Sequence, residues 1–205
     1  AVHQPFAIVV GCADARVPTE LIFGQGTNDL FVLRVAGNVL GAEVLGSIDY
    51  GLDHLAGSVR LVVALGHMGC GAVEAATNAF LDPASYLALA SEHHLRTIVN
   101  HVLPAVRLAD EALVIKHGRA VRDKPGYRAA LIDASVVINA GMVGATLASH
   151  VRMSGAADVG VVFAVYDLES RLIGIPGIGP GNTFRQGLLA PPTDREAFVE
   201  QAAIY

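Results

Sequence analysis

The chain has 205 residues, of which 53% are hydrophobic and 16% are charged, and its formal net charge at pH 7 is −5. This length fits a single domain over residues 1–205 with a substantial buried core. The negative charge and the lack of a run rich in Lys or Arg exclude an electrostatic footprint for nucleic acid or for an anionic membrane. Small molecules are the expected partners, and the apolar composition predicts that another copy of the chain covers part of the surface.

Four short apolar runs predict the strands of a parallel sheet. Each run is rich in Val and Ile and is continuous rather than alternating, which is typical of strands covered on both faces. The runs span residues 6–11, 30–35, 60–66 and 159–168, and residues 171–175 are expected to add a short edge strand.

Helical periodicity fills the intervals between these runs. A short helix is expected over residues 18–23, an amphipathic helix over residues 42–56 and a long helix over residues 126–153. Residues 83–125 have helical periodicity but no strand, and are too short for a core of their own, so we interpret them as an inserted pair of helices. The order of elements predicts an α/β fold in which a mostly parallel sheet is flanked by helices.

Two stretches suggest functions that their surrounding sequence does not favour. Residues 134–151 contain no Asp, Glu, Lys or Arg, as a membrane span would. Their polar residues and glycines favour instead a helix packed in a globular core or in a subunit interface. The glycine-rich residues 177–182 do not join a strand to a helix, so they are a weak candidate for a phosphate-binding loop.

The chain has only two cysteines, Cys12 and Cys70. Secreted scaffolds that depend on disulfides usually carry more cysteines in shorter chains. We recognise no signal peptide in the first residues, which have the pattern of a strand. We therefore expect two reduced thiols in a cytoplasmic protein.

Side chains with metal-binding chemistry follow neighbouring strands of the predicted sheet. Cys12 comes directly after the first strand, and His67 and Cys70 come after the third. The carboxyl ends of parallel strands form the crevice where such sheets bind ligands, so we expect these side chains to converge. Two thiolates and one imidazole suit Zn²⁺ and leave its fourth tetrahedral position open, as catalytic zinc requires.

Two other interpretations use the same side chains. Cys12 or Cys70 could be a nucleophile with His67 as its base, although this leaves the other cysteine without a role. A redox dithiol is the weaker alternative, because neither cysteine belongs to a Cys-x-x-Cys motif.

Three sequence blocks resemble the pattern of the β-class carbonic anhydrases. They read CADAR at residues 12–16, LFVLRVAGN at residues 30–38 and LGHMGCGAV at residues 65–73, in the order found in that family. The resemblance covers most of residues 6–173. It implies a zinc enzyme that interconverts carbon dioxide and bicarbonate on a mostly parallel sheet, assembled as a homodimer or a higher even-numbered homo-oligomer.

The resemblance also implies roles for residues of these blocks. Cys12, His67 and Cys70 match the zinc ligands, and Asp14 and Arg16 match a catalytic pair. Asp14 is expected to orient the zinc-bound hydroxide that attacks carbon dioxide, while Arg16 keeps the carboxylate charged and in place. The family has an open state and a closed state in which the aspartate is the fourth zinc ligand, and the sequence leaves both open.

Further positions match the family's substrate cleft and its supporting loops. The cleft candidates are Gly71, Phe31, Ala36, Tyr50 and His3. His54 is the candidate for passing protons to buffer. Arg34 and Asn38 are expected to brace the loops.

Two alternative functions fit the same motifs. The same scaffold could hydrolyse carbonyl sulfide or carbon disulfide, because zinc hydroxide attacks those linear electrophiles too. A non-catalytic homologue could keep the fold to bind zinc or bicarbonate, but structural zinc needs neither Asp14 nor Arg16, and the chain has both.

Overall fold

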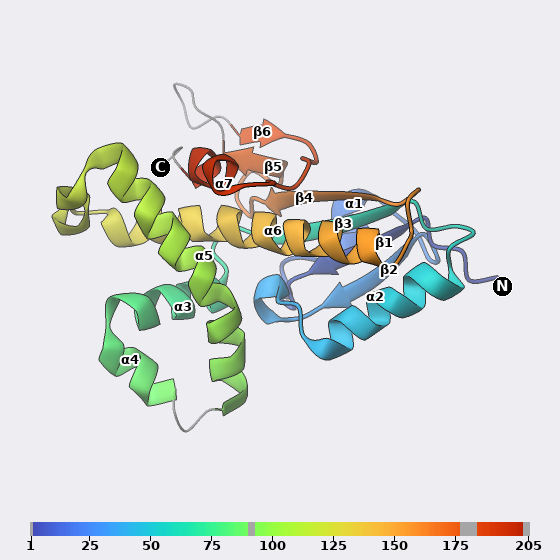
Figure 1. The fold of residues 1–205 in the computed structure, drawn as a ribbon, viewed down its shortest axis with the longest axis horizontal. Helices are drawn as coiled ribbons and strands as arrows, with labels where there is room; N and C mark the ends of the chain where they lie inside the picture. Colours follow the sequence, from blue (N-terminus) through green and yellow to red (C-terminus); the bar gives the residue numbers. More distant parts are fainter. Residues whose placement is uncertain (1, 90–92, 177–183, 203–205) are drawn as a thin grey trace.

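The strands form one mixed sheet (Figure 1). The computed structural model describes residues 2–89, 93–176 and 184–202. Within these residues, six strands pair in the order β2-β1-β3-β4-β5-β6. The first four are mutually parallel, whereas β5 and β6 are antiparallel to their neighbours. The strands are β1 (Ala7–Gly11), β2 (Leu30–Arg34), β3 (Leu61–His67), β4 (Gly160–Tyr166), β5 (Ile173–Pro176) and β6 (Phe184–Gln186).

The predicted α/β fold with a mostly parallel sheet is confirmed, but one edge of the sheet differs from the prediction. The segment expected to be an edge strand forms β5, and β6 lies outside it. Only three residues long and partly exposed, β6 carries no apolar pattern that would mark it. Its pairing with β5 depends on Gly174, because a Cβ there would clash with the backbone of Arg185. The glycine-rich residues 177–182 lie outside the described residues.

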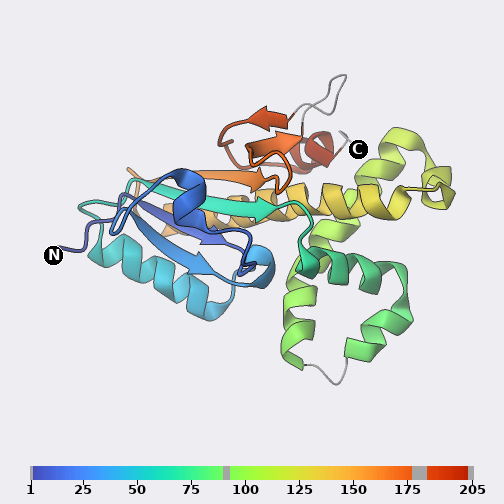
Figure 2. The same cartoon turned by 180° about the vertical axis from the view of Figure 1, so that it is seen from behind.

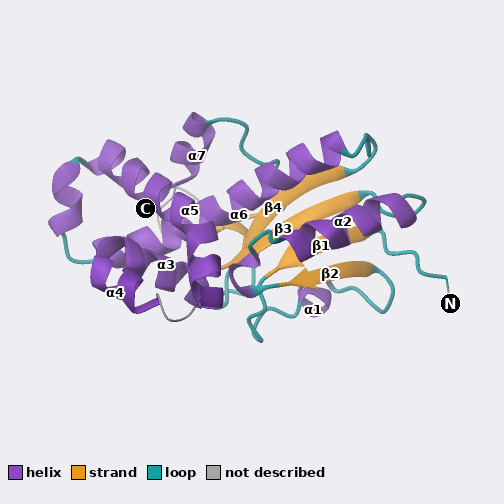
Figure 3. Ribbon diagram, turned by 60° about the horizontal axis from the view of Figure 1, so that its bottom comes forward, coloured by secondary structure: helices purple, strands orange, loops and turns teal. Residues whose placement is uncertain are grey.

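Helices cover both faces of the parallel strands (Figures 2 and 3). On one face lie α2 (Ala42–His54) and α6 (Tyr127–Met153), and on the other lies α1 (Thr19–Phe23). The side chains of β1 alternate accordingly, with Ile8 in the large core cluster shared with α2 and α6 and Val9 in a smaller cluster on the α1 side. Burial on both faces explains why the strands have continuous apolar runs.

The long helix α6 forms the centre of the core. By length and composition it could cross a membrane, but 72% of its most apolar window is buried inside the protein. Glycines allow the helix to lie close to the sheet: a Cβ on Gly66 would be 3.0 Å from the Cβ of Ala140, and a Cβ on Gly144 would be 3.1 Å from the Cβ of Phe163. The interpretation of this stretch as a core helix is confirmed.

Further helices extend beyond the carboxyl ends of the parallel strands (Figure 1). A pair of helices was expected in residues 83–125. The described residues there form a short helix, a long helix and a 3-10 turn. The long helix packs against α3 and α6, and its Val102 and Val106 are fully buried in the main core cluster. A helix that was not predicted, α7, packs against the same long helix and α6. The bounds are α3 (Gly71–Leu81), α4 (Pro83–Ala88), α5 (His93–His117), η3 (Arg119–Asp123) and α7 (Arg195–Ala202).

A buried carboxylate holds this helical group together. Asp110 of α5 is 6% exposed, and it accepts hydrogen bonds from Arg122 Nε at 2.8 Å and from the hydroxyl of Tyr127. Burial opposes its ionisation, but the bonds from Arg122 and Tyr127 outweigh burial and lower the pKa of Asp110. Burial and this carboxylate together raise the pKa of Tyr127 to about 12. The three side chains thus tie η3 and the start of α6 to α5.

Replacing this carboxylate is predicted to destabilise the protein. Asp110→Asn should lower the free energy of unfolding at pH 7 by about 1.5–3 kcal/mol, the usual contribution of hydrogen bonds to a charged group. Because the folded-state pKa of Asp110 is lowered, this stabilisation is present above the unfolded pKa of about 4 and is lost as the pH falls through the folded value. Urea denaturation at pH 7 and at acidic pH measures both effects.

Glu111→Gln is the matched control, because Glu111 forms an exposed ion pair with Arg195. Exposed pairs contribute about 0–1 kcal/mol. Equal losses in the two variants would contradict the role assigned to Asp110.

Candidate metal centre

Three side chains converge at the carboxyl end of the sheet. Cys12 follows β1, His67 is the last residue of β3, and Cys70 is the N-cap of α3. β1 and β3 are adjacent and parallel with Gly11 opposite Leu65, so both strands end at the same edge. The two sulfur atoms and a ring nitrogen lie within 4.8 Å of one another, and all three residues are buried. The structure therefore brings together the side chains that the sequence suggested as metal ligands.

A tight turn between β3 and α3 sets the spacing of His67 and Cys70. Gly69 has a φ of 66°, in the left-handed region that favours glycine. The N–H of Met68 donates to the carbonyl of Tyr166 at 2.9 Å, which continues the pairing with β4 to the end of β3. The turn leaves Cys70 at the amino end of α3, where the helix dipole favours a thiolate.

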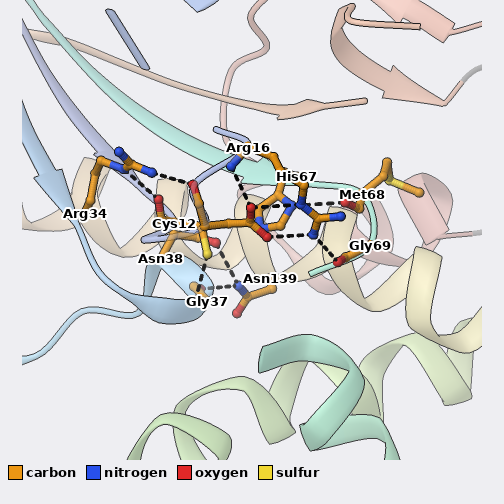
Figure 4. Close-up of polar contacts among 10 residues, drawn as sticks. Cys12, Arg16, Arg34, Gly37, Asn38, His67, Met68, Gly69 and Asn139 are labelled. Carbon is orange, nitrogen blue, oxygen red and sulfur yellow. Dashed lines mark hydrogen bonds and ion pairs between the residues drawn. The ribbon is translucent and has the colours of Figure 1, made fainter. Parts of the chain in front are cut away.

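The ring of His67 is oriented by the same turn (Figure 4). Its Nδ1 lies 3.0 Å from the carbonyl of Met68, and it must carry the proton because a carbonyl only accepts. In the neutral ring the other nitrogen, Nε2, carries no proton and can bind a metal. This Nε2 atom is buried and has no hydrogen-bond partner among the described residues. A cation held between the ring and the two sulfurs would satisfy it.

Cys12 and Cys70 are free thiols with exposed fractions of 4% and 2%. The adjacent Cys70 thiol, together with the smaller effects of the His67 ring and the backbone, outweighs burial and lowers the pKa of Cys12 to about 4. The same interaction and burial raise the pKa of Cys70. One thiolate therefore forms readily, and a bound cation would favour the second. Such complete burial does not suit a nucleophile, because reactive thiols are partly exposed.

Asp14 and Arg16 form an ion pair beside this cluster (Figure 4). Arg16 Nε donates to Asp14 Oδ1 at 3.0 Å, and Arg16 Nη2 donates to Asp14 Oδ2 at 2.7 Å. The Arg16 guanidinium holds the pKa of the Asp14 carboxyl well below its usual range. Asp14 Oδ2 also lies 3.9 Å from His67 Nε2. The carboxylate thus adjoins the cluster while both of its oxygens are engaged by Arg16.

Arg34, at the end of β2, braces the loop that carries these residues. Its Nε donates to the carbonyl of Cys12 at 2.9 Å, and its Nη2 donates to the carbonyl of Asp14. One guanidinium thereby spans the backbone of both residues (Figure 4). This contact is the bracing that was expected of Arg34.

Gly37, which contacts the centre, and Asn139, which contacts Gly37, were missed by the sequence reasoning. The N–H of Gly37 donates to Cys12 Sγ at 3.4 Å, and Asn139 of α6 donates to the carbonyl of Gly37 at 3.0 Å. The one signal for Asn139 in the sequence is an amide within an apolar helix. Nothing local connects it to a turn 102 positions earlier.

The cleft candidates fall into two groups, and the first lies at the centre. Ala36 begins η1 (Ala36–Asn38), the turn that contacts Cys12. Gly71 is the first residue of α3, directly after Cys70.

The second group forms an aromatic row at the other end of the strands. Ring centroids are 6.1 Å apart for His3 and Phe31, 6.4 Å for Phe31 and Tyr50, and 4.6 Å for Tyr50 and His54. In the parallel register Phe31 lies opposite Ile8, near the start of β1, and α2 runs back toward that end (Figure 1). Within one chain, these four side chains are therefore not brought to the centre.

A cavity of about 570 Å³ opens beside the ion pair. Arg16, Met68 and Gly69 line its inner side, and Asp133 and Asp167 are among the residues that line the rest. Burial and the charge of Asp167 raise the pKa of Asp133. The cavity thus adjoins Arg16 and the turn between β3 and α3, while the sulfur atoms and the imidazole are buried.

Comparison with known proteins adds the family context. Residues 7–173 match the family model described as carbonic anhydrase. Carbonic anhydrase 2 of Mycobacterium tuberculosis is 45% identical over 109 residues, which cover 52% of this chain and 48% of that protein. The carbonic anhydrase of Mycolicibacterium smegmatis is 43% identical over 110 residues, 54% of this chain and 50% of that protein. The chain thus spans about half the length of the curated relatives it matches.

Solved structures share the fold at low sequence identity. The β-carbonic anhydrase CcaA superposes with a TM-score of 0.65 at 17% identity, over 93% of this chain and 85% of that chain. The β-carbonic anhydrase CafA of Aspergillus fumigatus gives 0.57 at 19% identity, over 97% and 82%. One of two tetrameric β-carbonic anhydrases of Sordaria macrospora gives 0.50 at 20% identity, over 84% and 80%.

The geometry predicts that the reduced protein binds about one equivalent of zinc per chain. Cys12→Ser and His67→Ala should each weaken zinc binding by more than about 10-fold, because each removes one of the three donors that converge among the described residues. Elemental analysis and competition with a chelator measure content and affinity. His54→Ala is the control, since His54 is exposed and lies in the aromatic row. Wild-type protein without zinc would refute the metal centre and favour the thiolate nucleophile.

Proposed function

Because the chain belongs to the β-class carbonic anhydrase family, we propose that it catalyses the zinc-dependent, reversible hydration of carbon dioxide to bicarbonate and a proton. One observation carries this proposal. Two buried sulfur atoms and an imidazole lie within 4.8 Å of one another, and the nitrogen Nε2 of that imidazole, from His67, has no hydrogen-bond partner among the described residues.

The donor set fits zinc and leaves room for chemistry. Cys12, His67 and Cys70 would hold the ion, and a soft set of three protein ligands leaves one tetrahedral position for water or substrate. A catalytic zinc ion lowers the pKa of a coordinated water to about 7 and would supply the nucleophile here; two thiolate ligands acidify that water less than three histidines do, which makes an orienting acceptor more important.

The Asp14 carboxylate is placed to orient that nucleophile. Arg16 keeps it ionised and engages both of its oxygens, while Oδ2 faces the cluster at 3.9 Å from His67 Nε2. A carboxylate in this position accepts a hydrogen bond from the nucleophile and directs its lone pair toward carbon dioxide. These two bonds from Arg16 also keep the Asp14 carboxylate from turning onto the metal. This pairing supports the open state over the closed one.

The amino end of α3 is placed to receive the product. Gly71 starts this helix next to Cys70, and helix N-termini offer free N–H groups to anionic oxygens. Ala36 belongs to the turn that contacts Cys12. We assign both to the binding of carbon dioxide and bicarbonate.

A second copy of the chain is part of this proposal. His3, Phe31 and Tyr50 lie at the far end of the strands, so they can line the cleft only if another copy contributes them. The same holds for His54 as a proton carrier. We therefore propose a homodimer or a higher even-numbered assembly, in accord with the apolar composition of 53%.

The two free thiols of the centre favour a reducing compartment, and we propose that this compartment is the cytoplasm.

The zinc-loaded protein is predicted to hydrate carbon dioxide. Stopped-flow measurement with a pH indicator, above neutral pH where the nucleophile is deprotonated, detects the proton released per turnover. Release of hydrogen sulfide from carbonyl sulfide or carbon disulfide is measured in parallel. Faster turnover of those substrates would reassign the chemistry, and no turnover of any of them would identify a binding protein.

Removing the Asp14 carboxylate is predicted to separate catalysis from metal binding. Asp14→Ala should keep its zinc, because the three donors remain, and should lose about 10–100-fold in turnover of carbon dioxide, the usual effect of removing a group that orients a metal centre. Arg195→Gln is the control, since it breaks an exposed ion pair with Glu111 far from the centre. Turnover equal to that of the wild type in Asp14→Ala would contradict the assigned role.

A further inference from the structure

A left-handed turn lies against the sulfur of Cys12 (Figure 4). Gly37 and Asn38 both have positive φ, 67° and 47°, so the chain bends sharply after β2. The N–H of Gly37 donates to Cys12 Sγ at 3.4 Å, and it is the one hydrogen bond from this turn to the sulfur among the described residues. Such a bond orients a thiolate and draws negative charge from it.

A side chain distant in the sequence holds this turn in place. Asn139 of α6 donates from Nδ2 to the carbonyl of Gly37 at 3.0 Å and lies 3.5 Å from Asn38 Oδ1. The exposed fractions of Asn139 and Asn38 are 4% and 2%. Burying two amides in an apolar core is costly unless they are hydrogen-bonded, so this contact is a specific feature of the core.

The opposite side of the turn is closed by α3. A Cβ on Gly37 would lie 3.0 Å from the Cβ of Ala72, in the first turn of the helix that follows Cys70. The turn is therefore wedged between α3 and the Asn139 amide. Both the position and the direction of the Gly37 N–H depend on this wedge.

We propose that Asn139 is a positioning residue for the metal centre. By binding the Gly37 carbonyl it fixes the Gly37 N–H, and that N–H in turn orients the Cys12 sulfur and limits the charge that the sulfur donates to the metal. The inference rests on the proposed function, because it assumes a metal held by Cys12. It adds a link between the centre and the long core helix α6, which supplies none of the three ligands.

Cobalt substitution tests this link directly. Co²⁺ bound by cysteine has a sulfur-to-metal charge-transfer absorption whose energy reports the charge on the sulfur. Asn139→Leu keeps the size of the side chain and removes its donor, so this absorption should move to longer wavelength. Zinc affinity, measured by chelator competition, should fall by about 10-fold.

Two further variants keep the test decisive. Ser135→Ala is the matched control, because Ser135 is fully buried one turn earlier on α6 and donates to the carbonyl of Leu131 within its own helix. It should leave the absorption unchanged. Asn38→Gly keeps the left-handed backbone and removes the acceptor Oδ1, so it should shift the absorption in the same direction as Asn139→Leu, by less, even if Asn139→Leu fails to fold.

The outcomes separate this inference from the proposed function. No charge-transfer absorption in the wild-type protein would overturn the metal centre and the inference together. A wild-type absorption that is unchanged in Asn139→Leu, or in Asn38→Gly where the former does not fold, would overturn the inference alone. An equal shift in Ser135→Ala would also overturn it, because the effect would then arise from any change in α6.

Discussion

The parallel register of β1 and β3 is the constraint on which the centre depends. With Gly11 opposite Leu65, the chain leaves β1 at the level where β3 reaches His67, so Cys12 and His67 meet at one edge. The turn at Gly69 then reverses the chain between His67 and Cys70, so that Cys70 lies beside the other two donors. A shift of one residue in this register would turn alternate side chains to the other face and separate the donors. The core clusters on both faces, with β1 buried throughout, resist such a shift.

Electrostatics explain why the centre suits a cation. Two thiols and an imidazole are buried together, and the adjacent Cys70 thiol already favours ionisation of Cys12. Asp14 adds a further negative charge nearby, but Arg16 neutralises it and holds it away from the sulfur atoms. The pair thus keeps a carboxylate at the edge of the centre without making it a fourth donor. The cavity beside Arg16 lies on the side of the ion pair where the guanidinium is exposed.

Much of this arrangement was predictable from the sequence because its causes are local. Each parallel strand is a continuous apolar run, and Cys12 and His67 mark where two of these runs end. The aromatic row was harder to place, because its position follows from the strand register and from the direction of α2 rather than from any motif. β6 and α7 lack a distinctive pattern and are defined by what they pack against. Asn139 is the clearest case, since its partner lies 102 residues away and only the packed core brings them together.

Zinc K-edge X-ray absorption of the reduced, zinc-loaded protein tests the central claim most directly. Two sulfur atoms at about 2.3 Å, one nitrogen at about 2.0–2.1 Å and one further light-atom ligand are predicted for a centre built from Cys12, Cys70 and His67. The sulfur shell should lose one atom in Cys70→Ser. A zinc environment without sulfur, or with four sulfur atoms, would contradict the account.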